Sequence, residues 1–398
     1  MAVLSEEQTM LRDAAKAWVQ DKSPVTAFRT LRDSARVFLA ESAPVAHLRR
    51  LRDSRDEAGF SRTLWKSFVE MGFTGILVPE AHGGLGLGHT EAGLVMQEIG
   101  RNLTVSPFLA SSVVAVCAIV KGAGAEQQAR WLPALVRGER IASLAVDESS
   151  KHQPEQIALR ATRTERGWLL SGQKTFVLEG HVADWLIVAA RIAGAPGDEQ
   201  GIALFLLPRE TAGVEVERVL LVDAHHAARV RFSNVAVGAD ALLGDAAQGH
   251  IALQAALDAG RAAAAAEMLG LADEVFTRTL AYLKERKQFD RRIGEFQALQ
   301  HRAAMLYCDI EMARAAVAHA STQLDAHADD ASSAVSVAKA RAGTSVTRAV
   351  QEGVQLHGGM GMTDELDMGL FMKRARVLQE LYGDAAFHAD RLAARRRY

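Results

Sequence analysis

The hydrophobic pattern of this 398-residue chain changes twice, and these two changes constrain its fold more than any single motif. Residues 1–138 show helical periodicity broken by short turns. Residues 139–245 contain alternating runs such as Val214-Glu-Val-Glu217, with continuous apolar runs at 186–190 and 202–207. Helical spacing returns in residues 246–398, with an apolar stripe at Leu299, Ala303, Leu306, Ile310, Ala313 and Val317. We therefore predict an α+β protein with an N-terminal helical domain, a central β-barrel or sheet domain and a C-terminal four-helix bundle.

The composition is that of a globular protein with several cores, because 49% of the residues are hydrophobic. Lys and Arg (46) nearly balance Asp and Glu (48), so no overall basic field favours nucleic acid. The chain starts without a leader-like segment, and its longest apolar run, Phe108 to Val120, is too short to span a bilayer. We therefore expect a cytoplasmic protein with no membrane span.

Cysteine and histidine spacing gives no indication of a disulfide framework or a metal site. Cys117 and Cys308 lie far apart in apolar helical patterns, where we expect buried, reduced thiols. No His, Cys or Asp cluster has the spacing of metal ligands. We therefore predict no metal centre.

A short internal repeat lies near the N-terminus. Residues 12–34 recur at an offset of twenty as residues 32–54, with ten of 23 positions identical. One continuous helix would place the two apolar stripes on opposite faces, so we expect Pro24 and Pro44 to break the segment into separate helices. One copy would then dock on the domain, while the other would find a partner, fray or cover a subunit contact.

Two motifs in the C-terminal region together indicate a cofactor site. Residues 286–300 read RKQFDRRIGEFQALQ, which we place on an amphipathic helix, and QLHGGMG follows from Gln355. They could supply a cation for a pyrophosphate, an aromatic edge for a flavin and glycine backbone for close approach. Arg286 could instead be a solvated arginine, and the glycines could form a helix C-cap and turn. We expect His357 to be structural.

The domain order and these motifs, with Pro79-Glu-Ala-His-Gly-Gly-Leu-Gly86 in the N-terminal region, resemble the acyl-CoA dehydrogenase family over essentially the whole chain. The resemblance implies an acyl-CoA dehydrogenase-like fold, an FAD cofactor and a homotetramer whose cofactor sites need neighbouring subunits. The FAD-contacting residues that it implies are Arg286, Gln288, Phe289, Gln297, Gln355, Gly358, Gly359, Phe176 and Leu178.

The chain departs from the family pattern at three places. Leu178 stands where the family has a hydroxyl against the flavin, so that side-chain hydrogen bond is lost. Asp147-Glu-Ser-Ser-Lys151 replaces a Thr-Glu-Pro-Gly type segment, and Asp290 replaces a glycine beside the arginine expected at the pyrophosphate. These changes weaken the expectation of tight FAD binding.

The catalytic base implied by the resemblance is Asp384. The family's usual bases are a Glu in a Glu-Gly pair near the C-terminus, or a carboxylate just before a conserved arginine. Gly260 occupies the second place, before Arg261. At the first place an ungapped match aligns Tyr382 with the Glu, whereas a shift of two residues brings Asp384 there, and a branch of the family carries Gly-Asp at this point. Asp384 could also, or instead, be the N-cap of the last helix.

Further residues are expected near the substrate. Arg261 and Gly383 are candidates for substrate contact, and Arg261 could instead pair with Glu267, which we expect to be a structural ion-pair partner. The Gly-Asp pair suggests bulky or branched acyl groups such as steroid side chains, by analogy alone.

The leading hypothesis is an FAD-dependent acyl-CoA dehydrogenase that removes the proton α to a thioester, transfers the β hydride to FAD and passes electrons to an electron-transfer flavoprotein. One alternative is a non-catalytic or FAD-deficient partner subunit in a heterotetramer with a homologue, suggested by Leu178, Asp290 and the Asp147 segment. Another is a flavin oxidase or monooxygenase on the same fold.

Overall fold

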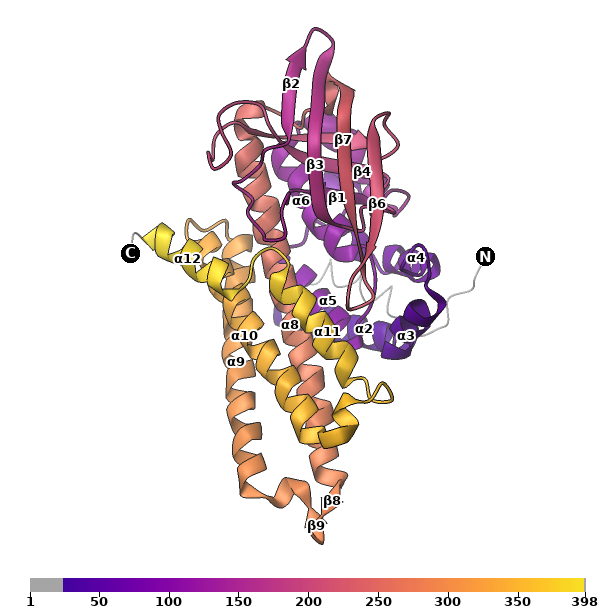
Figure 1. Cartoon of the computed structure of the whole chain (residues 1–398), viewed down its shortest axis with the longest axis vertical. Coiled ribbons are helices and arrows are strands. Elements are labelled where there is room, and N and C mark those ends of the chain that lie inside the picture. The colour runs from indigo at the N-terminus through magenta and orange to yellow at the C-terminus, as the bar shows by residue number, and fades with distance from the viewer. Residues whose placement is uncertain (1–23, 397–398) are drawn as a thin grey trace. The chain divides into compact units, whose positions relative to one another are not determined.

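The computed structural model describes residues 24–396 (Figure 1). Its helices are α2 (Pro24–Ser42), α3 (Val45–Ser54), α4 (Arg62–Glu70), α5 (His89–Asn102), α6 (Val116–Gly122), α7 (Ala125–Val136), α8 (Gly249–Glu285), α9 (Gln297–Asp325), α10 (Ala331–His357), α11 (Met368–Glu380) and α12 (Ala385–Arg396), with a π-helix, η3, at Phe108–Ala115. Its strands are β1 (Ala142–Ala145), β2 (Arg160–Thr164), β3 (Gly167–Leu178), β4 (Trp185–Arg191), β5 (Ile202–Pro208), β6 (Val214–Leu220), β7 (His226–Gly238), β8 (Lys287–Gln288) and β9 (Arg291–Arg292).

The described chain divides into two compact units. Unit one contains the described residues up to 34 together with 51–92 and 105–260, and unit two contains 35–50, 93–104 and the described residues from 261 onward. The three-domain division at residues 138 and 245 stays a prediction. No helix among residues 24–396 is long and apolar enough to cross a bilayer.

The sheet of unit one has the strand order β1-β4-β2-β3-β7-β6, and β5 pairs with β4 (Figure 1). The apolar runs predicted at 186–190 and 202–207 are the buried strands β4 and β5, and the predicted alternation at 214–217 lies in β6. These strand predictions are confirmed. Between Lys174 and Val177 the pairing of β3 with β7 shifts register, and Phe176 adopts a φ of 53° there. This irregularity turns the end of β3 away from a regular ladder.

Arg191, at the end of β4, fixes the loops beside that end of the sheet. It is 1% exposed, so its charge is stabilised only if its donors are paired. Its guanidinium donates to the backbone carbonyls of Glu155, Ile157, Ala193, Asp198 and Gln200. The side chain of Arg191 therefore supplies hydrogen-bond donors to these loop carbonyls, which lack the regular partners of a helix or strand.

The repeated N-terminal segment lies partly outside the described residues, because the first copy begins at residue 12. The second copy spans most of α2 and all of α3, and Pro44 lies between these helices, as expected. The break expected at Pro24 falls at the limit of the described chain.

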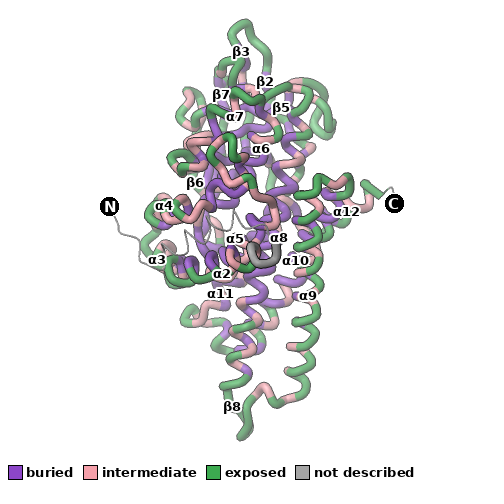
Figure 2. The backbone as a smooth tube through the Cα atoms, turned by 180° about the vertical axis from the view of Figure 1, so that it is seen from behind, coloured by how far each residue is buried: buried purple, intermediate pink, exposed green. Residues whose placement is uncertain are grey.

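The core of unit two is built on the small residues of α8, whose course is largely purple in Figure 2. Helix α5 approaches α8 closely: a Cβ on Gly270 would lie 1.9 Å from the carbonyl oxygen of Gln97, and one on Gly100 would lie 2.1 Å from that of Glu267. Only glycine permits such an approach. Helices α9 and α11 both pack against α10. Of the predicted stripe on α9, Leu306, Ile310, Ala313 and Val317 are buried, whereas Leu299 and Ala303 are half-buried.

Two local predictions are wrong. Residues 286–300 do not form one helix, because Phe289 and Asp290 adopt φ values of 54° and 60° and form the turn of the β8–β9 hairpin, and α9 begins only at Gln297. Cys308 is exposed on α9 rather than buried. Cys117 is buried as expected, and burial raises the pKa of its thiol to about 12.

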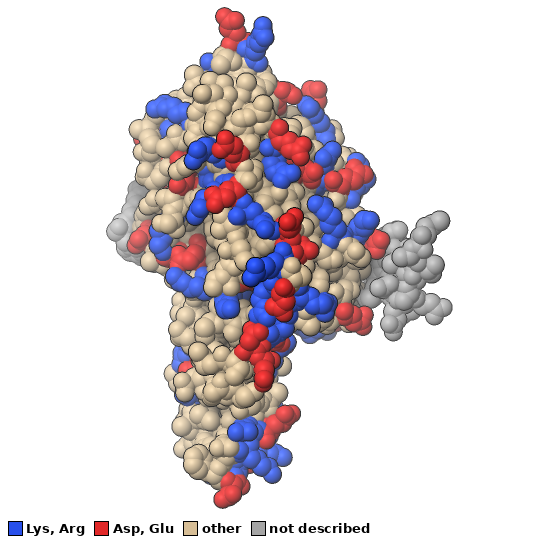
Figure 3. All heavy atoms as spheres, turned by 45° about the vertical axis from the view of Figure 1, so that its right-hand side comes forward, with Lys and Arg blue, Asp and Glu red and all other residues tan. Residues whose placement is uncertain are grey.

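Lys and Arg lie interspersed with Asp and Glu over the face shown in Figure 3, in keeping with a formal net charge of -2. None of the described His, Cys, Asp and Glu residues form a group that could hold a metal ion.

A partly buried histidine pair joins the segment after α3 to the sheet. His181 Nε2 donates to the carbonyl oxygen of Ala58 at 3.1 Å and lies 3.2 Å from His226 Nδ1. Burial lowers the pKa of His181 to about 4 and also lowers the pKa of His226. The unfolded chain therefore binds a proton at His181 near pH 6.5, whereas the folded chain does so only near pH 4.

We expect the free energy of unfolding to fall as the pH drops from about 6.5 to about 4, since the unfolded chain binds more protons in this window. Chemical denaturation at several pH values should show a shallower fall for His181→Gln. His319→Gln, at an exposed position on α9, is the control and should keep the wild-type slope. Equal slopes in all three proteins would contradict a role of His181.

Candidate functional site

The turn between α11 and α12 holds the predicted base. Tyr382 and Gly383 adopt left-handed φ values of 57° and 104°, and a Cβ on Gly383 would lie 2.3 Å from the ring of Phe387. The next residue, Asp384, accepts a hydrogen bond from the backbone N–H of Phe387 at 2.8 Å. Asp384 is therefore the N-cap of α12, as the sequence suggested.

Two buried cations hold this turn. Lys339 of α10 is 1% exposed and donates to the carbonyl oxygens of Leu378, Gln379 and Gly383. Arg261 of α8 is 0% exposed, and its Nε donates to the carbonyl oxygen of Tyr382 at 3.2 Å. The backbone N–H of Gly383 donates to the carbonyl oxygen of Glu380, so both backbone polar groups of Gly383 have partners within the chain.

Glu267 pairs with Arg374 rather than with Arg261. Arg374 Nε lies 2.6 Å from Glu267 Oε1, and the two side chains are 7% and 1% exposed. The expected structural ion pair is present, but the partner suggested for it was wrong, because Arg261 points toward the turn and lies over the ring of Phe387. Removing one partner of such a buried pair typically lowers the free energy of unfolding by about 3–5 kcal/mol. Glu267 therefore has a structural role in the core.

A pocket of about 590 Å³ opens beside Asp384. It lies between α10, α11 and the first turn of α12, and its lining residues are Lys339, Gly343, Thr344, Thr347, Arg348, Gln351, Arg376, Gln379, Glu380, Asp384, Ala385 and Ala386. Nine of these twelve residues carry polar or charged side chains.

The two cofactor motifs meet at the opposite end of α10, in a region that we call the tip: residues 286–292 and 355–362. Tyr282, four residues before Arg286, has its ring centroid 4.4 Å from that of His357. His357 itself is buried and bonded to the carbonyl oxygen of Gly353, as expected for a structural histidine. The structure thus brings the two motifs together.

The tip is exposed to solvent. Phe289 is 86% exposed and Met362 is 78% exposed. The other predicted cofactor residues here, Arg286, Gln288, Gln297, Gln355, Gly358 and Gly359, are also exposed. Apolar groups of this size are seldom left in water without a binding partner.

The glycines of the tip fit an approaching ligand. A Cβ on Gly358 or Gly359 would meet nothing within 4 Å in the chain. Gly358 adopts a left-handed φ of 61°, a conformation that favours glycine, whereas the backbone conformation of Gly359 does not require glycine. Such a bare backbone fits an anionic group such as the pyrophosphate of FAD.

The tip and the Asp384 turn lie far apart within one chain. Lys339 contacts Gly383, whereas Gln355 lies sixteen residues further along the same helix, which corresponds to about 24 Å. The structure therefore does not bring the predicted tip residues and Asp384 into one cluster.

The predicted flavin wall in unit one is Phe176 and Leu178, at the end of β3. Both are half-buried, and the carbonyl oxygen of Leu178 accepts from the hydroxyl of Ser143. Nearby, Asp147 is paired with His152, whose Nδ1 lies 2.9 Å from Asp147 Oδ2. The start of the altered 147–151 segment is thus held by a hydrogen bond between Asp147 and His152.

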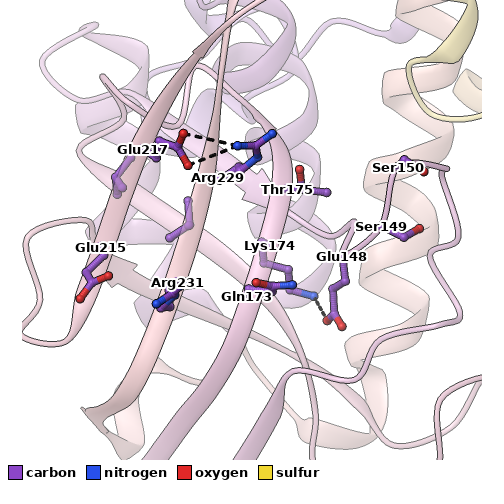
Figure 4. A pocket seen from close by; sticks show the side chains of 12 residues that line it. Glu148, Ser149, Ser150, Gln173, Lys174, Thr175, Glu215, Glu217, Arg229 and Arg231 are labelled. Carbon is purple, nitrogen blue, oxygen red and sulfur yellow. Dashed lines mark hydrogen bonds and ion pairs between the residues drawn. The ribbon is translucent and has the colours of Figure 1, made fainter.

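A second pocket, of about 670 Å³, lies over β3, β7, β6 and residues 148–150 (Figure 4). Glu148 accepts from the buried Lys174 at 2.7 Å, and Arg229 faces Glu217 across the sheet. Four of the charged residues that line this pocket thus form two pairs, and the lining offers no aromatic surface for a flavin ring.

Sequence reasoning missed Lys339, Lys174 and His152. Each is nearly inaccessible to solvent, with an exposure of 3% or less for its residue or side chain. The only signal for Lys339 was a single lysine among apolar residues at helical spacing, which is also typical of a solvated helix face.

A sheet segment between two helical segments, with an exposed glycine and arginine tip, defines a flavoprotein of the acyl-CoA dehydrogenase-like fold. The family models agree: Acyl-CoA dehydrogenase, N-terminal domain matches residues 26–139, the middle domain 147–235 and the C-terminal domain 247–396. The chain belongs to the acyl-CoA dehydrogenase family, whose members are oxidoreductases that act on acyl-CoA and use FAD.

Relatives and solved structures agree with this assignment. Acyl-CoA dehydrogenase fadE12 of Mycobacterium bovis is 32% identical over 330 residues, 79% of this chain and 82% of the relative. A structure of a variant of the Tcur3481-Tcur3483 steroid ACAD has 30% identity and a TM-score of 0.82 over 98% of each chain. The ChsE4-ChsE5 complex from Mycobacterium tuberculosis has 26% identity and a TM-score of 0.85 over 95% of this chain and 99% of that chain.

The open backbone at Gly359 gives a testable prediction. Gly359→Ala should change the free energy of unfolding by less than about 0.5 kcal/mol, because the added methyl meets no atom of the chain. FAD binding by the assembled protein should weaken about tenfold, since one extra methyl in a close contact costs about 1–3 kcal/mol. Flavin absorbance after dialysis measures the loss. Gly369→Ala on α11, equally free of neighbours, should keep its flavin. Unchanged flavin content in Gly359→Ala would contradict the contact.

Proposed function

We propose that this protein catalyses FAD-dependent α,β-dehydrogenation of an acyl-CoA thioester and passes the electrons to an electron-transfer flavoprotein. The observation that supports this most directly is the fixed turn 381–384: two buried cations and an N-cap hold the turn that carries Asp384, the residue expected to be the base. A base must be held in place and ionised at the working pH, and nearby cations favour the ionised carboxylate.

In this proposal Asp384 accepts the proton that leaves the α-carbon of the thioester. FAD, when bound, accepts the hydride that leaves the β-carbon. Arg261 acts through the carbonyl oxygen of Tyr382 and is a positioning residue, which replaces the direct substrate contact expected for it. Gly383 would meet the substrate through its Cα, since both of its backbone polar groups are engaged. Phe176 and Leu178 would pack against the flavin ring.

The tip would serve the FAD of a neighbouring subunit, since it lies at the other end of α10 from Asp384. Arg286 would pair with the pyrophosphate, and Gln288, Phe289 and Gln297 would surround the cofactor. The pyrophosphate and the adenosine side of FAD would also be contacted by Gln355, Gly358 and Gly359. This requires a homotetramer or a heterotetramer with a homologue, and we place the protein in the cytoplasm.

The substrate class that we propose is a bulky or branched acyl-CoA, such as one with a steroid side chain. The Gly383-Asp384 pair supports this, because the carboxylate of aspartate reaches less far than that of glutamate and requires a different substrate placement. The similar structure titled as a steroid ACAD is in keeping with the same class.

The first experiment is a visible spectrum of the purified protein, followed by anaerobic addition of short, branched and steroid acyl-CoA thioesters. We expect an oxidised flavin band that bleaches with a bulky thioester. A flavin band that none of the thioesters bleaches would contradict the proposal. Rapid reoxidation of the bleached flavin by oxygen would favour an oxidase instead.

Asp384→Asn tests the base. Asparagine keeps the N-cap of α12, so the protein should fold, but it cannot accept the proton, and the rate of flavin reduction should fall about 10²–10⁴-fold. Stopped-flow absorbance measures this rate. Asp390→Asn, an exposed carboxylate on the same helix, is the matched control and should reduce flavin at the wild-type rate. A fully active Asp384→Asn protein would exclude Asp384 as the base.

A second candidate function is a partner subunit that does not bind FAD in its own wall and completes the site of a homologue. The Asp147–His152 hydrogen bond and the missing hydroxyl at Leu178 favour it, because they change the wall in unit one, whereas the glycines of the tip in unit two stay open to a ligand. The ChsE4-ChsE5 structure is titled a complex, in keeping with such an assembly. A colourless protein alone that gains flavin only with a homologue would support this function, and flavin retained by the protein alone would exclude it.

A further inference from the structure

Lys339, which is 1% exposed, is one of the two buried cations beside the proposed base. It lies near the middle of the first half of α10, and its ammonium group reaches across to the end of α11. A lysine ammonium has three N–H donors. They match three carbonyl oxygens, those of Leu378 at 2.9 Å, Gln379 at 3.3 Å and Gly383 at 2.9 Å. Its hydrogen-bonding capacity is thus used on the segment that precedes Asp384.

The three carbonyl groups lie where the regular backbone hydrogen bonding of α11 ends. Those of Leu378 and Gln379 belong to the last turn of α11, where a helix has no further N–H groups to offer. That of Gly383 follows the left-handed residues Tyr382 and Gly383, which interrupt regular hydrogen bonding. Without Lys339 the carbonyls of Leu378 and Gly383 would be buried without this partner, and each would cost about 1–3 kcal/mol.

The charge of Lys339 also acts on the turn. Burial, and the neighbouring Arg261 of α8, lower the pKa of Lys339 to about 7, while Asp384 and Glu380 oppose this shift. Lys339 and Asp384 line the same pocket. The lysine is therefore coupled both to the backbone of the turn and to the carboxylate that follows it.

We propose that Lys339 is a positioning residue for the dehydrogenation, which holds the turn 381–384 and favours the ionised carboxylate of Asp384. This inference rests on the proposed function of Asp384. The lysine need not touch the substrate: it acts through the carbonyl oxygen of Gly383 and through its charge. A small displacement of this turn would move the base from its productive position, and a displacement of about 1 Å can cost about 10²-fold in rate.

The test compares Lys339→Gln, Lys339→Arg and the exposed control Lys373→Gln on α11, each as flavin-loaded holoenzyme with a homologous subunit where the protein requires one. In Lys339→Gln, kcat should fall about 10–100-fold while KM changes less than about threefold. The acid limb of the kcat/KM profile should move up by about one pH unit, because no cation favours the ionised carboxylate. A residue that only stabilises the fold would lower the melting temperature without moving this limb.

Lys339→Arg keeps the charge but presents a planar fork instead of three tetrahedral donors. We expect the acid limb to return to its wild-type position, with kcat still reduced about fivefold or more. Lys373→Gln should match the wild type in both respects. A folded Lys339→Gln protein with wild-type kcat and pH profile would overturn the proposal. If Lys339→Gln does not fold, wild-type kcat in Lys339→Arg would overturn it.

The outcome for Asp384→Asn separates the two proposals. If Asp384→Asn loses activity and Lys339→Gln behaves like the wild type, the base assignment stands and the role of Lys339 fails. If Asp384→Asn is fully active, the base assignment fails, and the proposal for Lys339 fails with it as stated.

Discussion

Backbone carbonyl groups that are removed from water need donors, and in this chain buried cations supply them where the helices and strands end. In unit one, Arg191 bonds the carbonyls of the loops beside β4, and Lys174 bonds that of Val146. In unit two, Lys339 and Arg261 do the same for the turn after α11. A long side chain from a regular element thus fixes an irregular segment, which is how the segments at the candidate site become rigid.

The rigid turn and the open tip have different physical requirements. The turn must hold a carboxylate, so its polar groups are satisfied inside the chain and its strained φ values are stabilised by neighbours. The tip has the opposite character, since Phe289 and the bare backbone of Gly359 have little to contact within the chain. A surface that is left incomplete in this way gains its partners only on binding, and α10 keeps it away from the chain's own turn.

The fold could be predicted from the sequence where periodicity was strong. The apolar runs of β4 and β5 and the stripe of α9 from Leu306 to Val317 lie where the pattern placed them. The hairpin at Phe289 and Asp290 could not be predicted in this way, because its amphipathic sequence also suits a helix. Left-handed φ values at non-glycine residues also leave no sign in the hydrophobic pattern. The exposure of Cys308 could not be predicted from the hydrophobic pattern either, since an apolar residue at helical spacing need not face the core.

The candidate site was predictable only in part, for a related reason. Motifs predict residues that meet a ligand, and they indicated the tip, whose ligand contacts stay a prediction. N-cap preference suggested the structural role of Asp384. The supporting residues left no such signal: Lys339 resembles a solvated lysine, and Glu267 resembles a partner for the nearest arginine in sequence, although it pairs with Arg374. Their roles depend on which elements meet in space. A change at Lys339 would therefore act on the proposed chemistry without altering any residue of the recognised motifs, so intact motifs alone do not establish an intact site.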